Sequence, residues 1–385
     1  MKFFHLSDLH IGKQLYHYSL LADQEHILKQ IVEAAREELP DAVLIAGDIY
    51  DVPVPSGEAV ALFDSFLSSL NDIVPQIPVL LIAGNHDSAR RIDFASSILA
   101  KHDVYIAGMP PVQPEESIKK VTLTDDHGEV DFYLLPFVKP SYVRKLFDEE
   151  IKNCDLAVKK LLERENIDPS RRNVLVSHQF YTAGSSAPET SDSEIHMVGG
   201  IENVDVMVLE PFTYAALGHI HKGQRIGKEQ YRYCGSPLPY SVSEAGTEKS
   251  ITIVELKEWG SAPEIRMYPL KPLRQVRKLT GTLEEILAEA DEEMRGDFVS
   301  ITLTDEVEAY HPKETLEEKF SRILEIRIDN ERTRSILEFS EEPMQNTNPY
   351  EAFLTFFRDM NGRGMTGQEE KMLREVLQEE TEEMQ

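Results

Sequence analysis

Short, largely apolar runs alternate with helical patterns through the first two-thirds of the chain. The runs over residues 3–6, 42–46 and 79–83 are too short for helices and end in glycine or polar residues. Between them, residues 23–39 and 57–70 carry apolar side chains at helical spacing. This strand–helix–strand order predicts an α/β fold whose sheets are buried on both faces.

Later segments extend the pattern beyond residue 130. Further strands are predicted over residues 131–135, 174–176, 206–208 and 214–217, and a further antiparallel group over 231–233 and 250–255. Residues 184–200 are polar and rich in serine, glutamate and glycine. Long segments of this kind are often functional, and we expect a surface loop there.

A shift in composition at Pro269–Leu270–Lys271–Pro272 favours a domain boundary. We expect a first domain over 1–270 and a small α+β domain over 271–340. In the small domain the patterns predict strands over 299–303 and 324–328 and helices over 283–290, capped by Thr282, and 313–322. Residues 341–385 are expected to hold a polar linker and two amphipathic helices, over 350–360 and 372–377.

Residues of the types that bind metals follow five of the predicted strands. They are Asp8 and His10, Asp48, Asn85, His178, and His219 with His221. Residues two apart in an extended segment face the same way, so the first and last pairs can each aim two ligands at one point. Oxygen and imidazole ligands together suit manganese, iron or zinc. Each element alone is more often structural, but the series predicts a metal centre.

The same series allows two metals in one site. A carboxylate such as Asp48 can bridge two cations, and Gly47 and Gly84 let the backbone turn tightly beside it. Two metals about 3.5–4 Å apart clamp the attacking and leaving oxygens of an in-line displacement at phosphorus. The pattern therefore favours a phosphoester hydrolase.

The motifs resemble those of the calcineurin-like metallophosphoesterase superfamily. They are Asp8-x-His10, Gly47-Asp48-x-x-Asp51, Gly84-Asn85-His86-Asp87, His178 and Gly218-His219-x-His221. The flanking residues 7–13, 198–201, 216–221, 233–238, 241–245 and 249–250 are similar to the SbcD family of bacterial nuclease subunits. The resemblance covers residues 1–270 by motif and the rest by order. It implies an α/β fold: a β-sandwich flanked by helices, a small α+β capping domain and a C-terminal helical tail.

The resemblance also implies a role for each site residue. One metal would be held by Asp8, His10, Asp48 and His221, and a second by Asp48, Asn85, His178 and His219. The two divalent ions would be Mn²⁺, with Mg²⁺ as the alternative. His86 would protonate the leaving oxygen after in-line attack by an activated water. Asp87 would either orient His86 or cap the following helix. Asp51 would either orient a neighbouring site residue or cap its own loop.

The implied substrate is DNA, cut as an exonuclease at double-strand ends and as an endonuclease in single strands and hairpins, in repair, recombination and replication. The implied partner is the SMC-like ATPase SbcC, in a heterotetramer built on a homodimer. Candidate DNA contacts are Lys13, Ser88, Arg90 and Arg91. The tail helices would either dock on the ATPase or pack on their own chain.

Charge and cysteine content limit these expectations. The chain has 40 Lys and Arg against 68 Asp and Glu, a net charge of −28, so it lacks the global positive field that grips DNA. We therefore expect weak DNA binding that depends on metal ions and on the ATPase. Two cysteines exclude a disulfide scaffold, and without a signal peptide or membrane span we expect a cytoplasmic protein. The alternatives are a scaffold for the ATPase with weak catalysis and a small-molecule phosphodiesterase.

Overall fold

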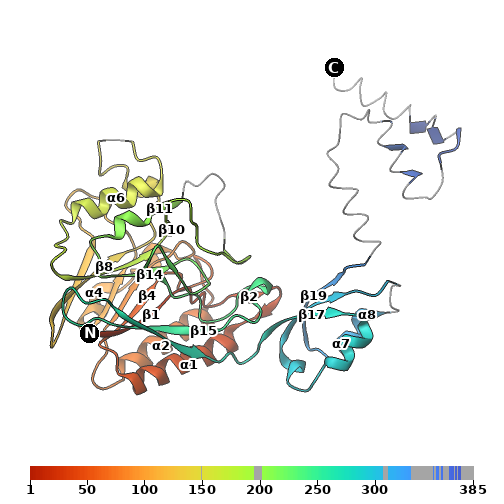
Figure 1. Ribbon diagram of the computed structural model, residues 1–385, viewed down its shortest axis with the longest axis horizontal. Coiled ribbons are helices and arrows are strands. Elements are labelled where there is room, and N and C mark those ends of the chain that lie inside the picture. Colours follow the sequence, from red (N-terminus) through yellow and green to blue (C-terminus); the bar gives the residue numbers. More distant parts are fainter. Residues whose placement is uncertain are drawn as a thin grey trace. The chain divides into compact units, whose positions relative to one another are not determined.

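The computed structural model (Figure 1) describes residues 1–148, 150–194, 202–306 and 311–330, and scattered positions between 350 and 373. The chain divides into two compact units, and the larger comprises Met1–Leu303 and Ala309–Arg327. The predicted linker and most of both predicted tail helices lie outside the described residues. Among the described residues, no helix combines the length and apolarity needed to cross a bilayer.

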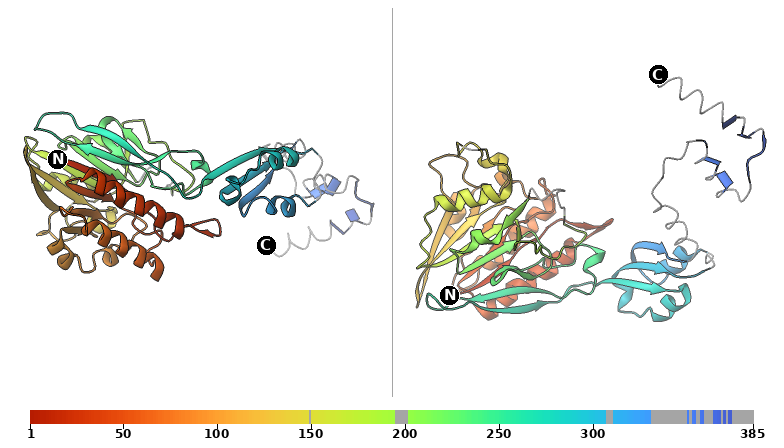
Figure 2. Two further views of the ribbon diagram at one scale, coloured as in Figure 1. Left: turned by 90° about the horizontal axis from the view of Figure 1, so that it is seen from below. Right: turned by 45° about the horizontal axis from the view of Figure 1, so that its top comes forward.

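Two six-stranded sheets lie at the centre of the larger unit (Figures 1 and 2). The first runs β16-β15-β1-β4-β5-β6, with strands at Glu264–Leu270, Lys249–Glu255, Lys2–Leu6, Ala42–Ala46, Val79–Ile82 and Val104–Ala107. The second runs β13-β14-β12-β9-β8-β7, at Gln224–Ile226, Lys228–Tyr233, Tyr214–Gly218, Arg172–His178, Gly128–Leu135 and Lys119–Asp125. β1, β4 and β5 are parallel, as are β8, β9 and β12. The carboxyl ends of each set therefore meet at one edge of their sheet.

The sheets pack face to face between two layers of helices. Phe3 and Leu44 of the first sheet share a core with Phe132 and Val174 of the second. The other face of the first sheet packs against α1 (Leu21–Glu38) and α2 (Gly57–Asn71), and that of the second against α6 (Cys154–Arg164). Because both faces are covered, a strand such as β4 is buried along its whole length. The predicted sandwich flanked by helices is confirmed.

The local sequence explains which face of α1 is buried and where α2 begins. In α1 the side chains of Ile27, Leu28 and Ile31 recur at helical spacing and are all buried against the first sheet. Ser56 caps α2 by accepting a hydrogen bond from the backbone N–H of Ala59 at 3.2 Å. These helices match the predicted segments 23–39 and 57–70 to within a few residues.

Short elements complete the sandwich. They are β2 (Gln14–Leu15), β3 (Tyr18–Ser19), α3 (Ala89–Ile92), α4 (Ser96–Leu99), η1 (Ala100–His102), α5 (Pro140–Val143), β10 (Phe180–Thr182), β11 (Asn203–Asp205), η2 (Val206–Leu209) and η3 (Val242–Glu244). Residues 184–194 contain no helix or strand, as the loop prediction requires, and 195–200 lie outside the described residues.

One strand prediction is wrong, and one prediction of which strands lie together is wrong. The run over 206–208 is the 3₁₀ turn η2, because the Asp205 side chain accepts the Met207 N–H at 2.8 Å and closes the turn, leaving Met207 exposed. The segments 231–233 and 250–255 are strands but not one antiparallel group. β14 is parallel to β12 in the second sheet, whereas β15 lies antiparallel to β1 in the first. Local sequence carries no information on which sheet a strand joins.

The small α+β pattern forms a three-stranded sheet with its own core. The order is β17-β18-β19, at Val276–Gly281, Phe298–Leu303 and Arg322–Ile328, with α7 at Leu283–Glu289, η4 at Met294–Gly296 and α8 at Pro312–Glu317. Thr282 caps α7 in a capping box with Glu285, as its sequence predicts. The helix α8 is shorter than predicted, because Phe320 turns into the core and Arg322 already begins β19.

Candidate metal centre

The loops that follow the central parallel strands bring the predicted ligands together. Asp8 and His10 follow β1, Asp48 follows β4, Asn85 follows β5, His178 ends β9, and His219 and His221 follow β12. The two sheets contribute from the same edge of the sandwich. The predicted ligands thus come from distant parts of the sequence into one cluster.

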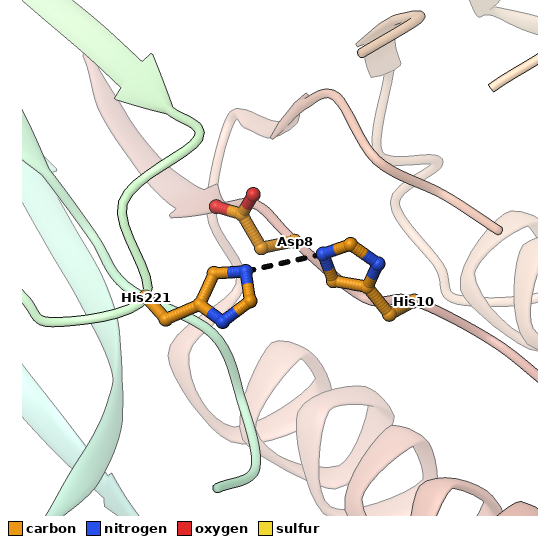
Figure 3. Close-up of side chains that lie close together, drawn as sticks. All are labelled: Asp8, His10 and His221. Atoms are coloured by element: carbon orange, nitrogen blue, oxygen red, sulfur yellow. Dashed lines mark hydrogen bonds between the residues drawn. The ribbon is translucent and has the colours of Figure 1, made fainter. Parts of the chain in front are cut away.

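One group of ligands is centred on His10. Its Nε2 lies 3.1 Å from Nε2 of His221, and Asp8 lies beside both rings (Figure 3). The Asp48 Oδ2 atom is 3.6 Å from the same nitrogen of His10. All four side chains are buried.

A second group is centred on Asn85. Its Oδ1 lies 2.9 Å from Nε2 of His178 and 2.9 Å from Nδ1 of His219. The same Asp48 Oδ2 that faces His10 lies 3.3 Å from Nε2 of His178. Asp48 therefore stands between the two groups.

Outer partners fix which ring nitrogen faces the centre. His178 donates Nδ1–H to the backbone carbonyl of Ala46 at 2.7 Å, so its Nε2 points inward. The Nδ1 of His221 lies 2.7 Å from the Ser193 hydroxyl, and its Nε2 faces His10. Ligand histidines are commonly oriented in this way by a group outside the metal's own shell.

The donor set fits divalent cations. With Nδ1 of His178 donating to a carbonyl, Nε2 of the neutral ring carries a lone pair directed at the Asn85 carbonyl oxygen, which is also an acceptor. Only a proton or a cation between these atoms makes the contact favourable. Burial disfavours a charged His178 ring, but Asp48 outweighs it and raises the pKa of His178 to about 9.

The backbone around the ligands is held in unusual conformations. Asp8, His10, Asp48 and His219 all have positive φ, at 52°, 43°, 51° and 100°. Such conformations cost about 1–3 kcal/mol each and persist where the surrounding structure enforces them, often at functional sites. Gly84 is needed for close approach, because a Cβ there would lie 2.1 Å from the Asp48 carboxylate.

His86 lies beside the predicted ligands, and its ring forms a further group of possible metal ligands with His10 and Asp51. Its backbone N–H donates to Asp48 Oδ1 at 2.9 Å, and its ring Nδ1 donates to the Asp51 carbonyl at 2.9 Å. The half-buried ring stands edge-on to His10, with centroids 4.8 Å apart. Its Nε2 is therefore the end available to a substrate.

The Asp87 side chain accepts hydrogen bonds from the backbone. Its carboxylate accepts the N–H groups of Ile49 and Tyr50, both at 3.0 Å, and of Gly84 at 2.9 Å. These bonds tie the loop after β4 to the loop after β5, which carry ligands of both groups. Burial and the nearby Asp48 charge raise the pKa of Asp87 to about 6.

The predicted DNA contacts differ in their surroundings. The Lys13 ammonium lies 2.7 Å from the Asp51 carboxylate and is mostly buried. Ser88 precedes α3 and is half-buried, whereas Arg90 and Arg91 on that helix are exposed. Among the described residues, neither arginine has a carboxylate within ion-pair distance. In the basic run over 271–278, both arginines pair with carboxylates instead.

A buried ion pair beneath His221 had no predicted role. Glu244 Oε2 lies 2.5 Å from the Lys249 ammonium, which also donates to the His221 carbonyl at 2.9 Å. Glu244 Oε1 is 3.7 Å from Nδ1 of His221 and accepts the Ser193 hydroxyl at 2.9 Å. Both residues lie in the flanking segments that resemble the SbcD family, but the sequence did not indicate that they pair beneath His221.

Comparison with known proteins places this site in a family. A family profile described as calcineurin-like phosphoesterase matches residues 1–223. A second, described as type 5 capsule protein repressor C-terminal domain, matches residues 269–361. The SbcD subunit of nuclease SbcCD from Staphylococcus epidermidis is 34% identical over 293 residues, covering 75% of each chain. Its counterpart of the same name from Staphylococcus saprophyticus is also 34% identical, covering 75% of this chain and 74% of its own.

The chain belongs to the SbcD family of calcineurin-like phosphoesterases. Solved structures resemble it more distantly. A dimetal phosphatase from Danio rerio is 14% identical with a TM-score of 0.41, covering 70% of this chain and 99% of its own. For an SbcD-family phosphoesterase, the buried oxygen and imidazole ligands form a site for divalent metal ions.

Proposed function

We propose that this chain is the nuclease component of an SbcCD-type complex and hydrolyses phosphodiester bonds in DNA. The observation that carries the proposal is Asp48, whose carboxylate lies between two groups of inward-facing histidines. This is the arrangement that a two-metal phosphoesterase requires. The relatives named as part of nuclease SbcCD support the substrate class and the partner, the SbcC ATPase.

The two groups of ligands divide between two metals. Asp8, His10, Asp48 and His221 would hold one ion, and Asp48, Asn85, His178 and His219 would hold the other. Because four of these seven residues are histidines, the set favours Mn²⁺ over Mg²⁺, which prefers oxygen. When bound, the ions supply an activated water and neutralise charge at the phosphate.

The protein's own residues orient the substrate and move the proton. The Asp51 carbonyl accepts the Nδ1 proton of His86, so in the doubly protonated ring the Nε2–H group would deliver its proton to the leaving oxygen and leave the neutral ring behind. Asp87 holds the loops that follow β4 and β5 in register. Arg90 and Arg91 contact the DNA backbone, with Ser88 and Lys13 as contacts closer to the centre.

The remaining parts of the chain serve the complex. The second family profile begins at residue 269, which supports a boundary near 270. We assign residues 271–340 to a domain that caps the site and positions DNA, and 341–385 to docking on the ATPase. The active assembly is a heterotetramer built on a homodimer, acting in DNA repair and recombination.

One assay tests the function. The full-length protein is incubated with Mn²⁺ and either labelled duplex and hairpin DNA or bis-p-nitrophenyl phosphate, with and without SbcC and ATP. We expect hydrolysis of both substrates, stimulated on DNA by SbcC, and loss of both in Asp48→Asn. Asp64→Asn, at an exposed aspartate on α2, is the matched control and should retain wild-type rates.

Two results would refute the proposal in different ways. Hydrolysis of the small diester without cleavage of DNA under any condition would indicate a small-molecule phosphodiesterase. Binding to SbcC without hydrolysis of either substrate would indicate a scaffold.

A further inference from the structure

A cavity adjoins the metal centre on the side of Asn85. It has a volume of about 400 Å³ and is bounded by the loops that follow β5, β6 and β8. Asn85, a member of the second ligand group, lines this cavity. Its size lies within the range of small-ligand sites, about 300–1,000 Å³. Whatever binds here lies next to the second metal position.

Aromatic rings form part of the cavity wall. Phe137 and Tyr142, from the segment after β8, are half-buried and line it. The Phe137 ring is stacked on the His219 ring, with centroids 6.4 Å apart and an interplanar angle of 26°. That contact and the hydrogen bond from the Phe137 backbone N–H to the Ala83 carbonyl at 3.0 Å fix its position. Fixed aromatic rings of this kind are platforms for planar ligands.

Two cations line the same cavity. Lys139 and Arg90 are exposed, and among the described residues neither lies within ion-pair distance of a carboxylate. Unpaired cations are informative in a chain with 68 acidic residues against 40 basic ones. The Lys139 ammonium lies 5.7 Å from the centre of the Phe137 ring. The Asp87 carboxylate, which also lines the cavity, is occupied by backbone N–H groups. The cavity therefore offers positive charge beside aromatic surface.

We infer that this cavity is a nucleotide subsite, which takes the nucleoside next to the phosphate held at the metal centre. The base stacks on the aromatic wall, and a flanking phosphate is bound by Lys139 and Arg90. Aromatic stacking combined with cations is how proteins hold unpaired nucleotides without reading their sequence. The inference rests on the proposed function, because it assumes that the phosphate at the metals belongs to a nucleic acid.

The test measures inhibition of bis-p-nitrophenyl phosphate hydrolysis by the full-length, Mn²⁺-loaded protein. The inhibitors are deoxyadenosine 5′-monophosphate and deoxyribose 5-phosphate, which differ in the presence of the base. The ratio of their inhibition constants separates stacking from phosphate binding. In the wild type we expect the nucleotide to inhibit at roughly tenfold lower concentration, the effect of one stacked base.

Variants of the cavity wall should change this ratio in a defined way. Tyr142→Ala should bring the two inhibition constants close together, whereas Lys139→Ala should keep the wild-type ratio, because neither inhibitor carries a second, flanking phosphate. Lys145→Ala, at an exposed lysine just beyond α5 that does not line the cavity, is the matched control and should keep the wild-type ratio. Because the readout is a ratio, a general loss of activity in a variant does not imitate the effect.

Equal inhibition by the two compounds in the wild type, or an unchanged ratio in Tyr142→Ala, would overturn the subsite. DNA cleavage distinguishes failure of the proposed function from failure of the subsite. If the wild type prefers the nucleotide through Tyr142 but cuts no DNA, the subsite stands and the nuclease does not. If it cuts DNA with no preference between the inhibitors, the nuclease stands and the subsite does not.

Discussion

Deleting the charge of Lys249 should destabilise the fold beneath the metal centre. The side chains of Glu244 and Lys249 are 4% and 5% exposed, and their charged atoms lie 2.5 Å apart. Lys249→Met keeps much of the side-chain volume and removes the ammonium. The Glu244 carboxylate is then left buried with hydrogen bonds from neutral groups, among them the Ser193 hydroxyl and the Tyr240 N–H.

The expected loss follows from this burial. Removing one partner of a buried ion pair costs about 3–5 kcal/mol, because the other charge stays in the interior uncompensated. With an unfolding entropy of about 2.1 cal/mol/K per residue, 1 kcal/mol corresponds to roughly 1.5 °C in Tm for a unit of this size. We therefore expect Lys249→Met to lower the Tm of the metal-free protein by roughly 4–7 °C.

The loss should also depend on pH. Burial raises the pKa of Glu244, but His221 and the Lys249 charge outweigh it and hold this pKa well below its usual range. The pair therefore stabilises the protein above the ordinary carboxyl pKa of 4.5 and loses that contribution as the pH falls through the lowered pKa. In Lys249→Met the unpaired carboxyl takes up a proton more readily. The difference in Tm between wild type and variant should therefore be constant from pH 8 to pH 5 and should narrow as the pH falls below about 4.5.

The assay is thermal unfolding of the full-length protein in a chelator, followed by circular dichroism. The double variant Glu244→Gln with Lys249→Met removes both charges and should recover much of the loss. Lys257→Met, which breaks an exposed pair with Glu264, is the matched control and should shift the Tm by about 1.5 °C or less. A loss for Lys249→Met no larger than the control's, or a double variant no better than the single one, would refute the reasoning.

Three further outcomes are expected. His86→Gln should retain both metals, measured by elemental analysis, and lose hydrolysis by about 10²–10⁴-fold; normal turnover would remove its role as the acid. Asp87→Asn turns an N–H group toward backbone donors and should lower the free energy of unfolding by about 1–3 kcal/mol, seen as a lower denaturant midpoint. An unchanged midpoint would contradict the view that Asp87 ties the loops after β4 and β5 together. Burial lowers the pKa of His178, but the Asp48 charge outweighs burial and raises this pKa to about 9. A proton must therefore leave His178 before a metal ion binds. Apparent Mn²⁺ affinity by calorimetry should therefore rise from pH 6.5 to pH 8.5, and a flat profile would argue against this ligand.

Much of the fold could be predicted because its strands are short and buried on both faces. The runs at 42–46 and 79–83 are apolar at almost every position, and a buried parallel strand needs that composition. The segment at 206–208 looks the same locally and is a 3₁₀ turn. Its difference lies in Asp205, whose side chain closes the turn, and in the exposure of Met207. Periodicity over three residues does not separate these cases.

The sequence by itself determined which residues could form the site. Ligand types at the ends of apolar strands, with glycines beside them, are a local property that the chain carries in its order. Only the tertiary structure decided how those residues combine. Asp48 lies between two histidine groups, and Glu244 with Lys249 sits beneath His221, because two sheets bring the ends of β1, β4, β9 and β12 to one edge. Packing of one sheet on the other depends on contacts between residues far apart in the chain, and no local pattern encodes those distances.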